Sequence, residues 1–175
     1  MREKIGFVPQ KAVLFSGTIN ENIRYGKADA TDEEIAHAAA VAQASDFITE
    51  MPDGFDSVIA QGGTNVSGGQ KQRLSIARAL VRKPEIYVFD DTFSALDFKT
   101  DARLRMALKR ETSDATVVIV AQRVSTVMDA DQIIVLDEGH IAGLGTHREL
   151  MQTCEVYREI VTSQLSQEEI AEEIA

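Results

Sequence analysis

Two carboxylates follow an apolar run near the middle of the chain. In the stretch "EIYVFDD", Asp90 and Asp91 come directly after residues that are predicted to form a buried strand. Because charged side chains avoid a core unless they are paired or bind a ligand, the pair is expected at the exit of that strand. Carboxylate oxygens in such a place are ligands for a Mg²⁺ ion held on phosphates. The alternative is that the two side chains only cap the strand-to-loop exit.

A glycine-rich turn precedes a strong helical pattern in "NVSGGQKQRLSIARAL". Gly68 and Gly69 let the backbone approach a ligand without a Cβ in the way. The start of the helix adds unpaired N–H groups with a partial positive charge, and the Ser67 hydroxyl adds one more hydrogen bond. The turn is therefore predicted to bind phosphate, although a bare Ser-Gly-Gly would indicate only an ordinary helix cap.

Three apolar runs are predicted to be buried strands. They lack polar alternation and are separated by helical segments, which is typical of a parallel sheet covered on both faces. Their residues are 4–8, 85–90 and 116–121. Two further strands, residues 132–137 and 140–145, flank Glu138-Gly139, which favours a tight turn between antiparallel edge strands. Together these patterns predict an α/β domain with a hairpin at one edge.

Amphipathic patterns predict helices between and after these strands. The ranges are 31–43, 69–82, 100–110 and 124–130, with two more helices within 148–164. A capping-box pattern from Thr31 to Glu34 begins the first of them. Proline and glycine residues gather between the first two ranges, so residues 52–68 are predicted to be a loop.

Composition and charge exclude several classes of protein. The chain has 175 residues, of which 44% are hydrophobic, so it can bury one sizeable core. No apolar run reaches the length of about 18 residues that a membrane span needs, and no signal peptide is recognised. The formal charge of −10 argues against nucleic acid as a partner. Cys154 is the single cysteine, which excludes an internal disulfide.

Four motifs in order resemble the ATP-binding cassette (ABC) family, from about Ile5 to Ser163. "FVPQ" resembles the Q-loop, "NVSGGQKQR" the signature motif, "IYVFDD" the Walker B strand and "SALD" the D-loop. "KAVLFSGTINENIRYG" and "IVLDEGHIAGLGTHREL" look like the exporter branch, in which a membrane-spanning half precedes the cassette. The resemblance implies an α/β fold of the P-loop NTPase type, with a mostly parallel sheet flanked by helices and a helical subdomain that carries the signature motif.

The resemblance also implies how the chain is divided. Residues 1–163 would be a partial ABC ATPase domain. Within it, residues 11–84 would form the helical subdomain, and residues 1–10 and 85–163 the α/β remainder. Residues 164–175, which are rich in glutamate, would be an acidic tail.

A phosphate-binding loop of the form G-x-x-x-x-G-K-[ST] is not found in the sequence. The nearest Gly-Lys pair, Gly26 and Lys27, has Glu21 where the first glycine belongs and Ala28 where the hydroxyl belongs. In the family this Walker A loop precedes the Q-loop, so the chain is expected to be a truncated cassette. As it stands, the fragment is expected to be inactive as an ATPase.

By resemblance, ATP and Mg²⁺ are the cofactors, and two cassettes pair head to tail. Asp90 and Gln10 would bind Mg²⁺, and Gln10 would also lie where the cassette meets the membrane domain. Asp97 would reach across the dimer interface. The residues that would hold the ATP of a partner cassette are Ser67, Gly68, Gly69 and Gln70.

Two positions depart from the family pattern. Asp91 stands where the family generally has a glutamate that orients or deprotonates the attacking water. One methylene less draws the carboxylate back by about 1.5 Å, which is enough to misplace that water. Gln122 stands where a histidine usually contacts the γ-phosphate, and an amide cannot become cationic. Both changes predict slow hydrolysis at a site built on this strand.

Together, these features predict that the chain is the degenerate half of a heterodimeric exporter. The full assembly would hydrolyse ATP. It would lie at the cytoplasmic face of the cell membrane. The chain's partners would be a second cassette and a membrane-spanning domain. Two alternatives stay open. The first is a non-catalytic fragment that docks on an intact cassette. The second is an ABC ATPase of chromosome maintenance or translation, although the chain shows neither coiled-coil insertions nor a basic surface.

Overall fold

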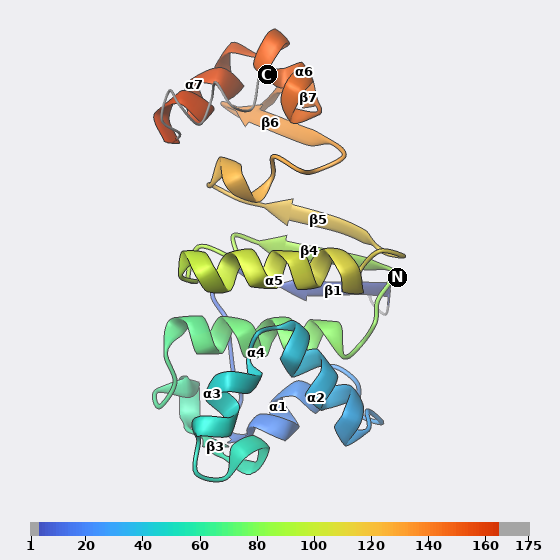
Figure 1. The fold of residues 1–175 in the computed structure, drawn as a ribbon, viewed down its shortest axis with the longest axis vertical. Helices are drawn as coiled ribbons and strands as arrows, with labels where there is room; N and C mark the ends of the chain where they lie inside the picture. Colours follow the sequence, from blue (N-terminus) through green and yellow to red (C-terminus); the bar gives the residue numbers. More distant parts are fainter. Residues whose placement is uncertain (1–3, 165–175) are drawn as a thin grey trace. The chain divides into compact units, whose positions relative to one another are not determined.

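The computed structural model describes residues 4–164. These residues divide into two compact units, one ending at Val120 and the other beginning at Ala121. Each unit is described by itself (Figure 1). No helix within the described range is both long and apolar enough to cross a membrane.

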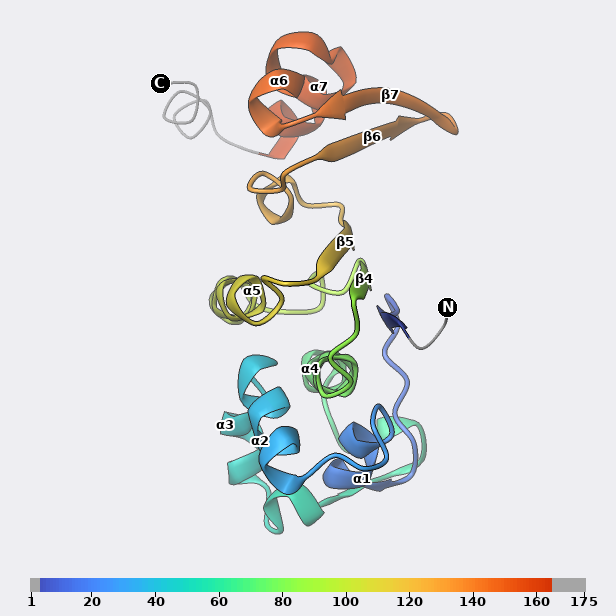
Figure 2. The same cartoon turned by 90° about the vertical axis from the view of Figure 1, so that its right-hand side faces the viewer.

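A three-stranded parallel sheet forms the centre of the first unit. In the order β1-β4-β5, its strands are β1 (Ile5–Val8), β4 (Ile86–Asp90) and β5 (Thr116–Val120). The three predicted strands and their parallel arrangement are confirmed. Helices α4 (Gly68–Leu80) and α5 (Phe98–Glu111) lie on the same side of this sheet (Figure 2). Side chains such as Val8, Tyr87 and Phe89 are buried in the core that these elements share.

The opposite face of this sheet carries exposed apolar side chains. Phe7 and Val118 both pair in register with Val88, and they are 57% and 45% exposed. Within the first unit, helices α4 and α5 therefore cover one face, whereas the sequence predicted that both faces are covered. An apolar run without alternation indicates that a strand is suited to burial, but it does not indicate which segment covers it.

Four helices and a short strand pair lie between β1 and β4 in the chain. The helices are α1 (Ile19–Arg24), α2 (Asp32–Val41), α3 (Ser45–Glu50) and α4, and strand β2 (Gly17–Thr18) pairs with β3 (Val58–Ile59). The predicted α2, α4 and α5 are confirmed within one or two residues at each end. Helices α1 and α3 were missed, because 6 residues are too few to show a helical period.

The segment that was predicted as a loop, residues 52–68, is mostly irregular. It holds β3 and two short 3₁₀ turns, η2 (Gly54–Asp56) and η3 (Gln61–Gly63). Gly62 and Gly63 both have φ near +68°, in the left-handed region that favours glycine. The glycines thus let this segment turn tightly before α4 begins.

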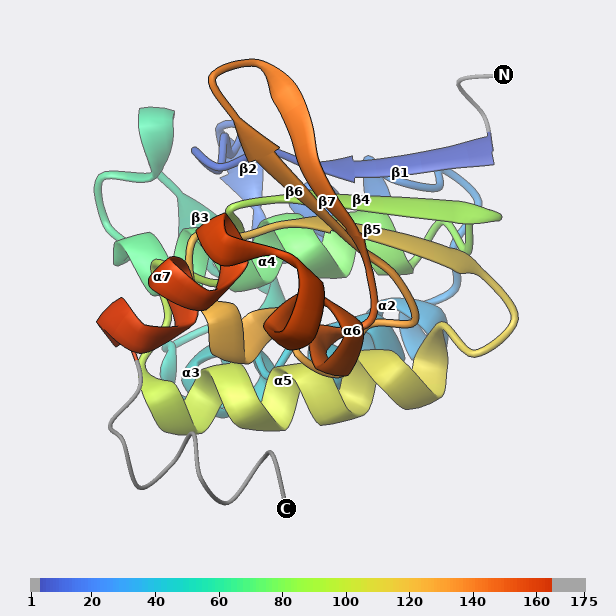
Figure 3. The ribbon, with the colours of Figure 1, turned by 90° about the horizontal axis from the view of Figure 1, so that it is seen from above.

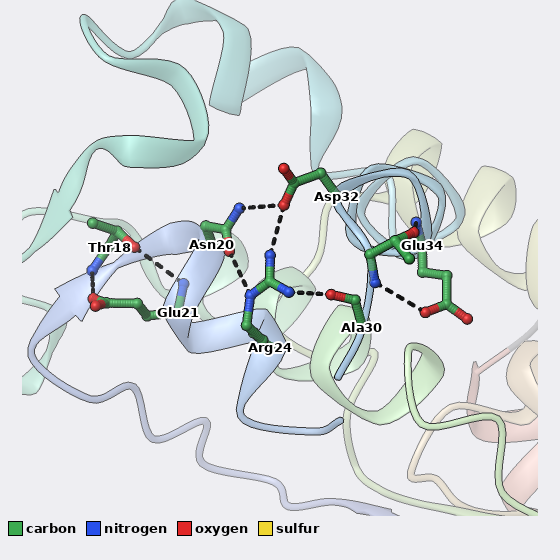
Figure 4. A network of polar contacts seen from close by, with 8 residues as sticks. Thr18, Asn20, Glu21, Arg24, Ala30, Asp32 and Glu34 are labelled. Atoms are coloured by element: carbon green, nitrogen blue, oxygen red, sulfur yellow. Dashed lines mark hydrogen bonds and ion pairs between the residues drawn. The ribbon is translucent and has the colours of Figure 1, made fainter. Parts of the chain in front are cut away.

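Polar contacts fasten α1 to the start of α2 (Figure 4). Arg24 donates to the carboxylate of Asp32 at 2.6 Å and to the carbonyl oxygen of Ala30. Thr31 and Glu34 form the predicted capping box, in which each side chain accepts a hydrogen bond from the other residue's backbone N–H. The capping box satisfies amides that the helix itself leaves unpaired, and the Arg24 contacts join the two helices.

The second unit contains a hairpin and two helices. Strands β6 (Ile133–Asp137) and β7 (His140–Gly145) are antiparallel, and they lie next to helices α6 (His147–Thr153) and α7 (Glu155–Gln164) (Figure 3). The turn at Glu138 and Gly139 has positive φ at both residues, as a two-residue hairpin requires. The predicted hairpin and helix pair are confirmed.

The predicted helix at residues 124–130 is wrong. The structure has a single 3₁₀ turn there, η4 (Val124–Thr126). The segment "VSTVMDAD" combines β-branched residues, serine and aspartate, all of which disfavour a helix interior. Val124 instead packs in the core of this unit with Ile133 and Leu150. The predicted acidic tail, residues 164–175, lies outside the described residues except for Gln164.

Candidate functional site

The acidic pair lies at the carboxyl end of β4, as the sequence predicted. Asp90 is the last residue of the strand and is half-buried. Asp91 follows with φ 42°, a left-handed conformation that aspartate tolerates better than most residues. Its backbone N–H donates to the carbonyl oxygen of Val120 at 2.8 Å, and the residue is only 9% exposed. The chain therefore turns sharply between two carboxylates of different exposure.

Gln10 contacts Asp91 across 81 positions of sequence. The Nε2 of Gln10 donates to Oδ2 of Asp91 at 2.9 Å. Because the amide donates through nitrogen, its Oε1 is left on the opposite side as an acceptor. Oxygen from an amide and a carboxylate is the donor set that Mg²⁺ prefers, so Gln10 and Asp90 fit such an ion chemically. Among the described residues no cluster of three or more histidine, cysteine, aspartate or glutamate side chains could hold a metal by itself.

Buried side chains hold the segment that leads to Gln10. The hydroxyl of Thr92, which is 0% exposed, donates to the carbonyl oxygen of Val8 at 3.2 Å. The Nε2 of Gln72, which is 2% exposed, donates to the carbonyl oxygen of Pro9 at 3.0 Å. Two successive carbonyls are thus bound from the exit of β4 and from helix α4.

Gln72 is a residue that the sequence analysis missed. It precedes Ile76 and Ala79 by four and seven positions, and all three are buried. That spacing marks one face of a helix, so the signal for burial was present. Nothing in the sequence indicated which backbone carbonyl the amide would bind, because its partner is 63 positions away.

The turn before α4 is exposed and capped by its own side chains. Ser67 is the N-cap, and its Oγ accepts from the backbone N–H of Gln70 at 3.2 Å. In return the Oε1 of Gln70 accepts from the backbone N–H of Ser67 at 2.8 Å. Gln70, which by resemblance would help to hold a partner's ATP, therefore has its side-chain oxygen engaged in this capping box. The backbone N–H groups of Gly68 and Gly69 lie in the first turn, where no preceding helical carbonyl is available.

Glycine at position 69 meets a packing requirement. A Cβ built on Gly69 would lie 3.3 Å from the carbonyl oxygen of Ala95, whereas one on Gly68 would meet nothing within 4 Å. Gly68 thus leaves its side of the turn open, as a ligand that approaches the backbone requires.

Asp97 is the N-cap of α5. Its Oδ1 accepts from the backbone N–H of Thr100 at 2.9 Å. The backbone amide of Thr100, followed by its hydroxyl, holds the pKa of the Asp97 carboxyl below its usual range. The side chain is exposed, and the neighbouring Phe98 is 79% exposed. This short segment thus presents a charge and an aromatic ring to the surroundings.

Gln122 belongs to the second unit. It is exposed, and its backbone carbonyl accepts from Nε2 of Gln164 at 2.7 Å. Of the three predicted residues Gln10, Asp91 and Gln122, the first two are in contact within the first unit. Gln122 lies in the second unit.

Two arginines of α4 fasten the helical part of the first unit. Arg73 lies over the ring of Phe47 at 4.8 Å and donates to the carbonyl oxygen of Gln43 at 2.7 Å. Arg78 lies over Phe15 at 5.0 Å and donates to the backbone of Val13. Burial lowers the pKa of both guanidinium groups. Their contacts are structural ones within the unit.

Comparisons with known proteins agree with this description. The family model for ABC transporters matches residues 1–94. The uncharacterized ABC transporter ATP-binding protein YfiB of Bacillus subtilis is 48% identical over 96% of this chain, which corresponds to 29% of that protein. The mitochondrial potassium channel ATP-binding subunit of Rattus norvegicus is 47% identical over 91% of this chain and 22% of its own length.

A solved structure is similar as well. A bacterial Atm1-family ABC exporter with ATP bound matches 95% of this chain with a TM-score of 0.91 and 40% identity, over 29% of the exporter chain. The chain thus spans less than a third of the length of these relatives. Since the family model covers more than half of the chain, and both the relatives and the fold agree with it, the chain belongs to the ABC transporter family and corresponds to part of its ATP-binding domain.

Proposed function

We propose that this chain is the ATP-binding part of an ABC exporter subunit, which couples ATP binding and hydrolysis to transport across a membrane. The observation that carries the proposal is the contact of Gln10 with Asp91 at the exit of β4. It joins two family motifs at the place where the family holds Mg²⁺ and water. Similarity to an exporter with ATP bound supports the same conclusion.

In this proposal, the residues at the exit of β4 serve the chain's own nucleotide. Asp90 and the Oε1 of Gln10 would hold a Mg²⁺ ion, which would supply positive charge to the phosphates. Asp91 orients the attacking water, and Gln122 contacts the γ-phosphate. Asp91 is already engaged by Gln10 and is shorter than glutamate, so its carboxylate is poorly placed to orient that water.

The turn before α4 serves the nucleotide of a second cassette. Its open backbone at Gly68 and the start of α4 suit the terminal phosphate of ATP. Ser67, Gly69 and Gln70 complete this surface, and Asp97 extends across the interface toward the partner's site. We therefore assign the chain to the degenerate half of a heterodimer, in which the partner's site turns over faster.

We also propose how the chain is divided into domains, which partners it has and where it lies in the cell. Residues 1–163 are the partial ATPase domain, with the helical subdomain at about residues 11–84. A membrane-spanning domain and a second cassette are the partners, and the cassette lies at the cytoplasmic face of the membrane. Without a Walker A loop, residues 1–175 by themselves are inactive as an ATPase.

The test compares variants of the turn before α4 with a variant of the acidic pair after β4, in the intact exporter purified with its partner. Ser67→Asp keeps a good helix cap but places a negative charge where the partner's phosphate binds. We expect ATP hydrolysis to fall by about 100-fold, as for the loss of a transition-state contact. Ser67→Asn, an equally good and neutral cap, is the matched control and should lose much less.

Asp91→Ala in the same assembly completes the test. Because this site is the slower one, hydrolysis should change by less than about threefold, a small effect on the scale of a catalytic base. A loss as large as that of Ser67→Asp would contradict the degenerate assignment. If Ser67→Asp changed nothing, the proposed role of the turn would be wrong.

A second candidate is a non-catalytic chain that docks on an intact cassette. The exposed apolar face with Phe7 and Val118 favours it, because a parallel sheet normally has both faces covered. A nucleotide titration of the intact exporter separates the two, because a docking chain adds no ATP site to the assembly. Residues 1–175 by themselves are expected to bind ATP with a dissociation constant weaker than about 1 mM in either case.

A further inference from the structure

We propose that Gln72 is a positioning residue: it holds the segment after β1 so that Gln10 can reach Asp91. The proposal rests on the function proposed above for Gln10 and Asp91. It adds a mechanical connection between helix α4, which begins at the signature turn, and the acidic pair at the end of β4.

The contacts form an unbroken series. Gln72 lies within α4, five positions after Ser67, and is almost fully buried at 2% exposure. Its Nε2 donates to the carbonyl oxygen of Pro9 at 3.0 Å. The next residue, Gln10, donates through its own Nε2 to Asp91 at 2.9 Å.

The peptide bond explains why the first contact orients the second. The carbonyl of Pro9 and the Cα of Gln10 belong to one planar peptide unit. A hydrogen bond that fixes the direction of this carbonyl therefore fixes where the Gln10 side chain starts. The preceding unit is fixed as well, because Thr92 binds the carbonyl of Val8 at 3.2 Å.

Burial makes the contact of Gln72 hard to replace. Pro9 is half-buried, but the Gln72 side chain that bonds its carbonyl is 2% exposed, so a water that replaced this donor would have to enter a buried position; without it, the peptide unit rotates to find another partner. Rotation of this unit moves Gln10 away from Asp91. By the same connection, a shift of α4 when a phosphate binds at the signature turn is passed to Gln10.

Lys71 provides a matched control on the same helix. It is the neighbour of Gln72, and its Nζ also donates to a loop carbonyl at 3.0 Å, but that carbonyl belongs to Gly62. Removing either donor deletes the same kind of contact, one position apart. Only the Gln72 contact leads to Gln10.

Hydrogen exchange of the ligand-free intact protein tests the positional part. Gln72→Met keeps the approximate volume and removes the donor. We expect faster exchange at residues 10–16 and unchanged exchange at residues 60–66. Lys71→Met should give the opposite pattern. Equal exchange at residues 10–16 in Gln72→Met and the unaltered protein would overturn the inference.

A double-mutant cycle tests the functional part, with Mn²⁺ in place of Mg²⁺ and binding followed by electron paramagnetic resonance with ATP present. Gln72→Met should weaken Mn²⁺ binding by about tenfold, as is usual when the support of a ligand is lost. In a Gln10→Ala background the same change should have no further effect. Lys71→Met should leave the affinity within about twofold of its original value.

The outcomes are separable. Additive effects of Gln72→Met and Gln10→Ala on Mn²⁺ affinity would overturn the inference, even if exchange changed as expected. If the unaltered protein bound no ATP, the proposed function would fail, and the exchange pattern would still decide whether Gln72 positions the segment. Should Gln72→Met not fold, Gln72→Leu also removes the donor and keeps an apolar side chain at this buried position, with the same expected results.

Discussion

The turn before α4 and the acidic pair after β4 are built in contrasting ways. The turn is exposed, and its cap is formed by Ser67 and Gln70, three positions apart. Asp91 is nearly buried and contacts Gln10 and the backbone of Val120, which come from distant parts of the sequence. A locally built site keeps its shape through small rearrangements of the fold, whereas a site built from distant segments depends on the core beneath it.

The largest expected effect is a loss of stability when the core beneath the acidic pair is altered. Phe89 is 0% exposed and directly precedes Asp90 in β4. Phe89→Ala should lower the free energy of unfolding of the first unit by about 3–5 kcal/mol, because it leaves a cavity in the core. Native-state hydrogen exchange of the β4 amides in the intact protein measures this loss. A loss smaller than that of Ser67→Ala would contradict the contrast between the two sites.

A gain of ATPase activity is expected when the site that contains the acidic pair is restored to the usual family residues. Asp91→Glu combined with Gln122→His restores the residue types usual in the family. In an exporter whose faster partner site has been inactivated, we expect ATP hydrolysis to rise by at least about tenfold, since a positioned base contributes substantially to rate. Steady-state phosphate release gives the rate, and the Asp91→Asn variant is the control that should show no rise. An unchanged rate in the double variant would count against the degenerate assignment.

The local cap of the turn should contribute a smaller amount. Ser67→Ala removes the acceptor for the Gln70 amide and should cost about 1 kcal/mol of stability in the first unit. Ser67→Asn retains a capping side chain and should cost much less. Exchange at the first amides of α4 reports the difference, and equal losses in the two variants would show that the hydroxyl does not stabilise the helix.

The smallest effect concerns the N-cap of α5. Because the folded-state pKa of Asp97 is lowered, its contribution to stability is present above the pKa of the unfolded chain. That contribution is lost as the pH falls through the folded-state pKa. Asp97→Asn caps the helix without titrating, so its stability should depend less on pH between about pH 5 and pH 2. Thermal unfolding at several pH values measures this, and identical pH profiles would contradict the assignment.

Much of the fold could be predicted from the sequence. The strands ending at Val8, Asp90 and Val120 are apolar runs of the right length, and the helix after Ser67 has both a cap and an apolar face. Helices of 6 residues escaped prediction, and residues 124–130 were assigned a helix that the structure lacks. Short segments carry too little periodicity to outweigh the packing around them.

The sequence by itself determined the family, the order of the strands in the chain, the capped turn at Ser67 and the place of Asp90 at a strand end, because each depends on residues close together in sequence. Only the tertiary structure decided that Gln10 donates to Asp91 and that Gln72 binds Pro9. Those contacts join positions 81 and 63 residues apart. Which distant groups meet is set by how the helices pack on the sheet, and side-chain patterns report burial without naming the partner.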